Sequence, residues 1–206
     1  DNCPEIADAA PWFTIAPGVR DFSGDKLEQA LFHGHPDLAL PRVLALGLGP
    51  RESVTPDIFR RAAAAALALE GVLLPAGQFA RFPGGPTRLA EETVCGALLG
   101  LYRFTRLRTP KEDDKPDPRR LTLGFTENSV PDGFHAAARR GEHAAVGVAL
   151  ARDLANTPPN ILTPAALGEA AEELARRHGM ACTLLDRAAL AELGCNALLA
   201  VGRGSA

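Results

Sequence analysis

The chain has 206 residues, of which 46% are hydrophobic and 23% are charged, the balance of a globular protein with a sizeable core rather than of a disordered chain. A formal net charge of −3 gives no general attraction to nucleic acid or to an anionic membrane. No apolar run reaches the roughly 20 residues that a membrane-spanning helix needs. We therefore expect no membrane partner and no nucleic-acid partner.

The four cysteines predict free thiols. They are widely spaced and include no CxxC pair: Cys3, Cys95, Cys182 and Cys195. This spacing fits neither a disulfide framework nor a zinc site. Cys95 and Cys182 lie in apolar stretches, where we expect buried thiols. The start of the chain shows no basic region followed by an apolar run, so no signal peptide is expected, and these features together predict a cytoplasmic location.

The first half of the chain predicts a strand followed by two helices. Residues 42–49 form an apolar run that ends in glycines, typical of a buried strand. Thr55 and Pro56 open a predicted helix that runs to about Leu74. The turn at residues 83–86 (Pro-Gly-Gly-Pro) precedes a second helix, for which Thr87 is the expected cap.

The second half continues this alternation. Residues 111–120 mix both charge signs with prolines and predict a solvated loop. The expected elements that follow are a strand at 120–125, a long helix from about Asp132 to Ala155, a helix at 165–178, a strand at 180–185, a short helix capped by Asp186, and a strand at 197–201. Strands alternating with helices predict an α/β fold with a mixed or largely parallel sheet flanked by helices.

A glycine-containing turn is the first candidate site. Residues 47–52 (Gly-Leu-Gly-Pro-Arg-Glu) follow a strand and precede a helix, as phosphate-binding loops do. The dinucleotide fingerprint needs a third glycine where this chain has Glu52, and Pro50 lacks the amide that would donate to phosphate. We interpret the segment as a plain strand-to-helix turn.

The remaining candidate groups form no catalytic pattern. The histidines lack further ligands at metal-site spacing; they are His33, His35, His135, His143 and His178. Three carboxylate pairs lack an acid/base partner and are interpreted as solvated surface: 91–92, 113–114 and 172–173. Basic groups at 103–108, 119–120 and 139–140 are offset by nearby acids. The sequence predicts no catalytic, cofactor-binding or metal-binding residue.

The most specific pattern is a stiff junction. In residues 151–164 (Ala-Arg-Asp-Leu-Ala-Asn-Thr-Pro-Pro-Asn-Ile-Leu-Thr-Pro), a long helix ends at Thr157, two prolines follow, and Thr163 with Pro164 starts a new helix. This junction resembles that of the leucyl aminopeptidase (cytosol aminopeptidase) family. Residues 43–49, 96–104 and 193–206 are similar to segments of that family in the same order.

The resemblance implies a domain organisation: an amino-terminal α/β domain of macro-like fold at residues 1–130, a linker helix and Pro-Pro hinge at 131–160, and the beginning of a metallopeptidase catalytic domain, an incomplete second α/β unit, at 161–206. The family's metal-binding segments have no counterpart in this chain, so the resemblance places them beyond Ala206.

The resemblance also implies a function for the parent protein. In the family, two divalent metals (zinc or manganese) activate a water that attacks the first peptide bond of a peptide substrate, and members form homo-hexamers. We expect this chain to be inactive alone and to serve scaffolding and oligomer assembly beside its own catalytic domain. The alternative is a regulatory DNA-binding module or an ADP-ribose-type binding module.

Overall fold

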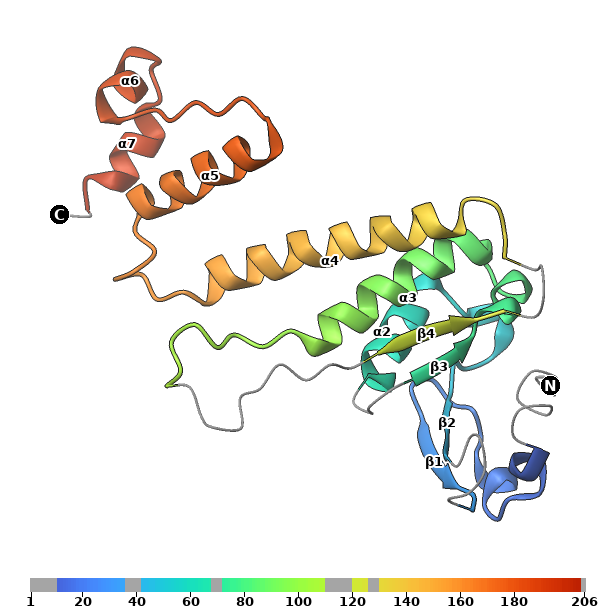
Figure 1. Ribbon diagram of the computed structural model, residues 1–206. Coiled ribbons are helices and arrows are strands. Elements are labelled where there is room, and N and C mark those ends of the chain that lie inside the picture. The colour runs from blue at the N-terminus through green and yellow to red at the C-terminus, as the bar shows by residue number, and fades with distance from the viewer. Residues whose placement is uncertain (1–10, 36–41, 68–71, 110–119, 126–129, 205–206) are drawn as a thin grey trace. The chain divides into compact units, whose positions relative to one another are not determined.

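A computed structural model describes residues 11–35, 42–67, 72–109, 120–125 and 130–204 (Figure 1). The chain divides into two compact units, Asp1–Arg152 and Asp153–Ala206. The predicted loop at 111–120 lies outside the described residues, apart from Arg120. No helix of the described residues is long and apolar enough to cross a membrane.

The first unit contains two separate two-stranded sheets. β1 (Gln29–His33) and β2 (Arg42–Leu46) are antiparallel, whereas β3 (Val72–Pro75) and β4 (Leu121–Gly124) are parallel. The strands predicted at 42–49 and 120–125 are confirmed as β2 and β4. Within the described residues, however, no ladder joins the two pairs into one sheet.

α2 (Pro56–Ala66) begins as predicted, with Thr55 in extended geometry before Pro56. It ends at Ala66, and β3 begins at Val72, so the predicted extension to Leu74 is wrong. The physical reason is local, because glycine, a β-branched residue and proline at 71, 72 and 75 all disfavour helix.

α3 (Gly85–Leu101) starts two residues before the expected cap. Gly84 precedes it in the left-handed region, with φ of 99°. Pro86 occupies the first helical turn, where its missing amide costs nothing. Thr87 is therefore inside the helix, and its assignment as the cap is wrong.

α2 and α3 pack with their backbones almost in contact and lie side by side in Figure 1. A Cβ atom on Gly96 would lie 2.0 Å from the carbonyl oxygen of Arg60, and one on Gly100 would lie 2.6 Å from that of Ala64. Small residues on both helices permit this approach, because α2 carries the alanine run 62–66. The close packing places the helix backbones so that Arg60 can reach across to α3.

The main hydrophobic core joins these helices to the neighbouring segments. Phe59 of α2 makes edge-to-face contacts with Phe79 and Phe82, with ring centroids 5.6 and 5.1 Å apart. The short 3-10 helix η4 (Ala76–Arg81) supplies Phe79. The other buried members of this cluster are Val54, Ala76, Leu89, Ala90, Phe134 and Ala137. The remaining 3-10 helices are η1 (Pro11–Ile15), η2 (Val19–Asp21) and η3 (Arg51–Ser53).

The long helix α4 (Phe134–Asn156) confirms the prediction of a helix from about Asp132 to Ala155. It approaches α3 closely, since a Cβ on Gly141 would lie 2.4 Å from the carbonyl oxygen of Glu91. The helix ends where the Pro-Pro pair predicts. The hydroxyl of Thr157 donates to the carbonyl oxygen of Asp153 at 2.6 Å, and the Thr157 side chain is buried.

The second unit is helical in its described part: α5 (Pro164–His178), α6 (Arg187–Glu192) and α7 (Asn196–Gly202). The strands predicted at 180–185 and 197–201 are wrong. Residues 180–185 pair with no strand in the described part of the chain, and a strand without a ladder has no stability. Residues 197–201 are alanine, leucine and valine, and a short apolar run of this kind fits a helix as well as a strand.

Two side-chain caps in this unit are confirmed. The Thr163 hydroxyl accepts from the amide of Ala166 at 3.2 Å, and the Asp186 carboxylate accepts from the amide of Ala189 at 2.8 Å. Both bonds satisfy helix amides that have no partner within the helix.

We expect Thr163→Ala to destabilise α5 by about 1 kcal/mol, because the Ala166 amide loses its acceptor. Hydrogen exchange followed by mass spectrometry or NMR should show faster exchange at Ala166. Thr183→Ala is the matched control, since the Thr183 side chain makes no hydrogen bond within the described residues. Equal exchange at Ala166 in both variants would contradict the capping role.

Candidate functional site

In the turn at residues 47–52, the amides of both glycines are already hydrogen-bonded to backbone carbonyl groups. The amide of Gly47 donates to the carbonyl oxygen of Glu28 at 2.8 Å, and that of Gly49 donates to Gly24 at 2.9 Å. Amides bonded in this way cannot surround a phosphate. The structure therefore supports the interpretation of a plain turn, here followed by η3.

The loop that contacts this turn is held by one carboxylate. Glu28 accepts from the hydroxyl of Ser23 at 2.6 Å and from the amide of Asp25 at 3.0 Å. The hydrogen bond from Ser23 and those from backbone amides lower the pKa of Glu28. Gly47 fits closely against the loop, because a Cβ there would lie 1.9 Å from the carbonyl oxygen of Asp25.

Leu27 in this loop has an unusual backbone. Its φ is 65°, in the left-handed region that costs a residue with a side chain about 1–2 kcal/mol. The amide of Leu27 donates to the carbonyl oxygen of Gly47 at 2.8 Å, and the bonds of Glu28 hold both sides of the loop. The surrounding hydrogen bonds therefore maintain the strained conformation.

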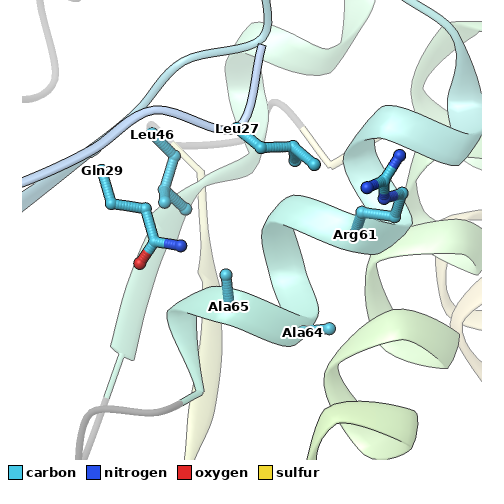
Figure 2. A pocket seen from close by; sticks show the side chains of 6 residues that line it. All are labelled: Leu27, Gln29, Leu46, Arg61, Ala64 and Ala65. Carbon is cyan, nitrogen blue, oxygen red and sulfur yellow. The ribbon is translucent and has the colours of Figure 1, made fainter.

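A pocket of about 330 Å³ opens beside Leu27 (Figure 2). It is lined by Leu27, Gln29, Leu46, Arg61, Ala64 and Ala65. Gln29 lies directly opposite Leu46 in the β1–β2 ladder, so both side chains are on the same face. Arg61, Ala64 and Ala65 share a face of α2, at the spacing of one helical turn. These six side chains are apolar except for the amide of Gln29 and the guanidinium group of Arg61.

Sequence reasoning missed this pocket. The helical spacing of Arg61, Ala64 and Ala65 was visible in the sequence, but nothing there indicated that Leu27 would adopt a left-handed conformation. The opposition of Gln29 and Leu46 also depends on β1, which the sequence did not predict as a strand.

The interpretation of residues 91–92 as solvated surface is wrong for Glu92. That side chain is only 8% exposed, and its carboxylate pairs with Arg88 at 2.5 Å and with Arg60 at 3.4 Å. Glu91, which is partly buried, pairs with Arg88 at 3.3 Å and with Arg140 of α4 at 3.0 Å. These ion pairs link α3 to α2 and to α4. Their role is structural, since the arginines occupy their oxygens.

The other charged candidates are exposed or paired locally. Glu173 pairs with Arg176 and Arg177, and these bonds lower its pKa. Arg103 donates to the carbonyl oxygens of Gly100 and Tyr102. Residues 113–114 and Arg119 lie outside the described residues.

The histidines do not gather. His33 ends β1 opposite Arg42, His135 and His143 are exposed on α4, and His178 ends α5. Within the described ranges, no three His, Cys, Asp or Glu side chains lie close enough to hold a metal ion.

The cysteines differ in accessibility. Cys95 is buried in α3, as predicted, whereas Cys182 is exposed and the prediction of its burial is wrong. Cys182 lies in the segment that was expected to be a strand, where no sheet covers it. Both are free thiols, as is Cys195. Burial raises the pKa of the Cys95 thiol.

We expect Cys182 to react with a thiol reagent much faster than Cys95, because reaction needs an accessible thiolate. Burial and a raised pKa both oppose reaction at Cys95. Time-resolved alkylation with peptide mapping measures the two rates, and the same measurement in denaturant is the control that should equalise them. Equal native rates would contradict the burial of Cys95.

Comparison with protein families identifies two successive domains. The cytosol aminopeptidase family, N-terminal domain, matches residues 19–111. The cytosol aminopeptidase family, catalytic domain, matches residues 149–206. The second match begins within the last third of α4, and the two matches lie in the order that the junction motif predicts.

Curated relatives carry the same family name. A probable cytosol aminopeptidase of Desulfovibrio desulfuricans is 54% identical over 98% of this chain, and one of Nitratidesulfovibrio vulgaris is 47% identical over 98%. This chain spans 42% of the length of each of these relatives.

This chain is similar in fold to several solved structures. The bottromycin maturation enzyme BotP is 32% identical with a TM-score of 0.72, over 91% of this chain and 39% of that enzyme. Its complex with Mn gives a TM-score of 0.70. A mutant of tomato leucine aminopeptidase has a TM-score of 0.69 at 22% identity, over 93% of this chain and 38% of its own length, a likeness of fold. With two domains of one family matched in order, and with curated relatives along nearly its whole length, this chain belongs to the cytosol aminopeptidase family.

Proposed function

We propose that this chain is the amino-terminal part of an aminopeptidase that releases amino-terminal residues from peptides. Residues 1–130 would form the amino-terminal, macro-like domain, 131–160 the linker helix and hinge, and 161–206 the beginning of the catalytic domain. The observation that carries the proposal is the order of the two family matches, amino-terminal domain first and catalytic domain second. The hydrogen bonds of Thr157 and Thr163 support a hinge between α4 and α5, within the second match.

Catalysis would reside in catalytic-domain sequence that this chain does not contain. The family resemblance implies two zinc or manganese ions, and BotP has been solved with Mn. The described residues of this chain do not fit such a centre, because no three metal-binding side chains gather there. We therefore derive no catalytic step from them.

The role proposed for this chain is scaffolding and homo-hexamer assembly in a cytoplasmic protein. The ion pairs of Glu91 and Glu92 and the close α2–α3 packing favour a rigid amino-terminal unit. The second unit carries many exposed apolar side chains, among them Ile161, Leu167, Leu185, Leu193, Leu198 and Val201. An apolar surface of this kind favours burial against further protein, and we propose the rest of the catalytic domain as that partner.

No observation supports the two alternative functions, a regulatory DNA-binding module and an ADP-ribose-type binding module. An ADP-ribose-type ligand needs amides for its phosphates, and those of Gly47 and Gly49 are already bonded. A formal net charge of −3 gives no general attraction to DNA, and Arg88 and Arg140 pair with acids.

A chimera tests the proposal. The purified chain should not hydrolyse a leucyl amide with added Mn²⁺ or Zn²⁺, whereas the chain joined to the rest of the catalytic domain of the Desulfovibrio desulfuricans relative should do so. Light scattering on the chimera tests the hexamer. Metal-dependent hydrolysis by the chain alone would contradict the assigned position of the site. A folded, metal-loaded but inactive chimera would contradict the aminopeptidase function.

A further inference from the structure

We propose that the pocket between the β1–β2 pair and α2 binds a small aliphatic carboxylate. In this assignment the guanidinium group of Arg61 takes the carboxylate, and the side chains of Leu27, Leu46 and Ala65 contact the hydrocarbon. The proposal rests on the pocket alone and does not depend on the aminopeptidase function.

Among the described residues that line the pocket, Arg61 is the only charged one. The adjacent Arg60 pairs with both nearby acids, Asp57 and Glu92. The Arg61 charge acts on Asp57 from a distance, but within the described residues Arg61 makes no hydrogen bond or ion pair of its own. Its planar fork of donors matches a carboxylate, and such a charge-assisted pair is among the stronger polar contacts.

Gln29 provides a second polar group. Figure 2 shows its amide entering from the β1–β2 side, while Arg61 extends from α2. The Gln29 amide also makes no hydrogen bond within the described ranges. A polar ligand can therefore bond to it without breaking an existing contact.

The size and chemistry of the walls limit the ligand. A volume of about 330 Å³ is at the lower end of the range for small-molecule sites. The apolar lining of Leu27, Leu46, Ala64 and Ala65 suits a branched or linear hydrocarbon chain of about six carbon atoms. A bare inorganic anion would leave this apolar surface unused.

The backbone of Leu27 is an independent observation that indicates a ligand site. Glycine or asparagine relieves strain at a left-handed position, yet this position has leucine, with φ of 65°. Figure 2 shows the Leu27 side chain directed toward Arg61. Strained residues that are held by surrounding hydrogen bonds concentrate at ligand sites, and this strain places an apolar group beside the guanidinium group of Arg61.

The pocket should discriminate against zwitterions. None of the lining residues in the described part of the chain is acidic, so the ammonium group of an amino acid would lack a partner among them and would lie near Arg61. Isocaproate, which is leucine without its amino group, is therefore the preferred probe over leucine itself. Isocaproamide has the same shape without the charge.

Titration of the isotope-labelled chain, followed by NMR, tests the assignment. Isocaproate should cause saturable shifts at the amides of Leu27, Gln29, Leu46, Ala64 and Ala65. We expect it to bind at least about tenfold more tightly than isocaproamide or leucine. Arg61→Gln should abolish this preference, whereas Arg139→Gln, the same change on an exposed site of α4, should preserve it.

Leu27→Gly separates binding from folding. This variant should raise thermal stability by relieving the left-handed strain and should weaken isocaproate binding, two effects of opposite sign. The proposal is overturned if isocaproate causes no saturable shifts at these amides, if leucine or the amide binds equally well, or if Arg61→Gln keeps the preference for the acid. Tighter binding by Leu27→Gly would also overturn it.

Discussion

Gly96→Ala should destabilise the first unit by about 3 kcal/mol, although alanine is normally the better helix former. The new Cβ would lie 2.0 Å from the carbonyl oxygen and 2.6 Å from the carbonyl carbon of Arg60. Both atoms belong to the α2 backbone, which cannot rotate away as a side chain can. The helices must separate, and contacts of the buried Ala63 and Ala97 would be lost.

Gly147→Ala is the matched control for Gly96→Ala. Gly147 also lies in a helix, but a Cβ there meets no atom within 4 Å. Since alanine lowers the entropy cost of helix formation, this variant should gain up to about 1 kcal/mol. Urea denaturation measures both free energies of unfolding. Equal changes in the two variants would show that α2 and α3 are not in backbone contact.

Glu92→Gln should destabilise the same unit by about 2 kcal/mol, which is less than the loss of a fully buried ion pair. The carboxylate is 8% exposed and is contacted by two arginines, whose side chains are 41% and 52% exposed. Because these arginines can turn toward water in the variant, hydration of their charges offsets part of the lost free energy. The neutral amide still fills the volume but cannot balance two positive charges.

Glu172→Gln provides the comparison for Glu92→Gln. Glu172 is exposed on α5 and has no hydrogen-bond or ion-pair partner within the described residues. We expect a change within about 0.5 kcal/mol. Thermal and urea denaturation under identical conditions measure both variants. A loss at Glu92 no larger than that at Glu172 would mean that Glu92 is a surface carboxylate after all.

Glu92 and Glu172 differ in burial, and the sequence did not predict this difference. Both are members of adjacent acidic pairs, at 91–92 and 172–173, and both were interpreted as solvated surface. Helical position alone does not distinguish them. Glu92 became buried because Gly96 brings α2 within reach and because Arg60 lies on the facing side of that helix.

Local signals correctly predicted the junction after α4 and two helix caps. Pro158 and Pro159 end α4 through steric exclusion, and Thr163 and Asp186 cap their helices through hydrogen bonds three residues along the chain. The expected strand at 197–201 failed because strand formation depends on a partner elsewhere. An unpaired apolar run of alanine and leucine forms a helix, whose hydrogen bonds are internal.

The sequence by itself determined where α4 ends, where α5 and α6 begin, and the family, since each depends on residues that are close together along the chain. Only the tertiary structure decided that Glu92 is buried, that the strands form two separate pairs, and that Leu27 and Arg61 meet at one pocket. These features depend on distances between distant segments, which propensity and spacing do not encode. The physical reason is that packing of one helix or strand against another sets the environment of each side chain.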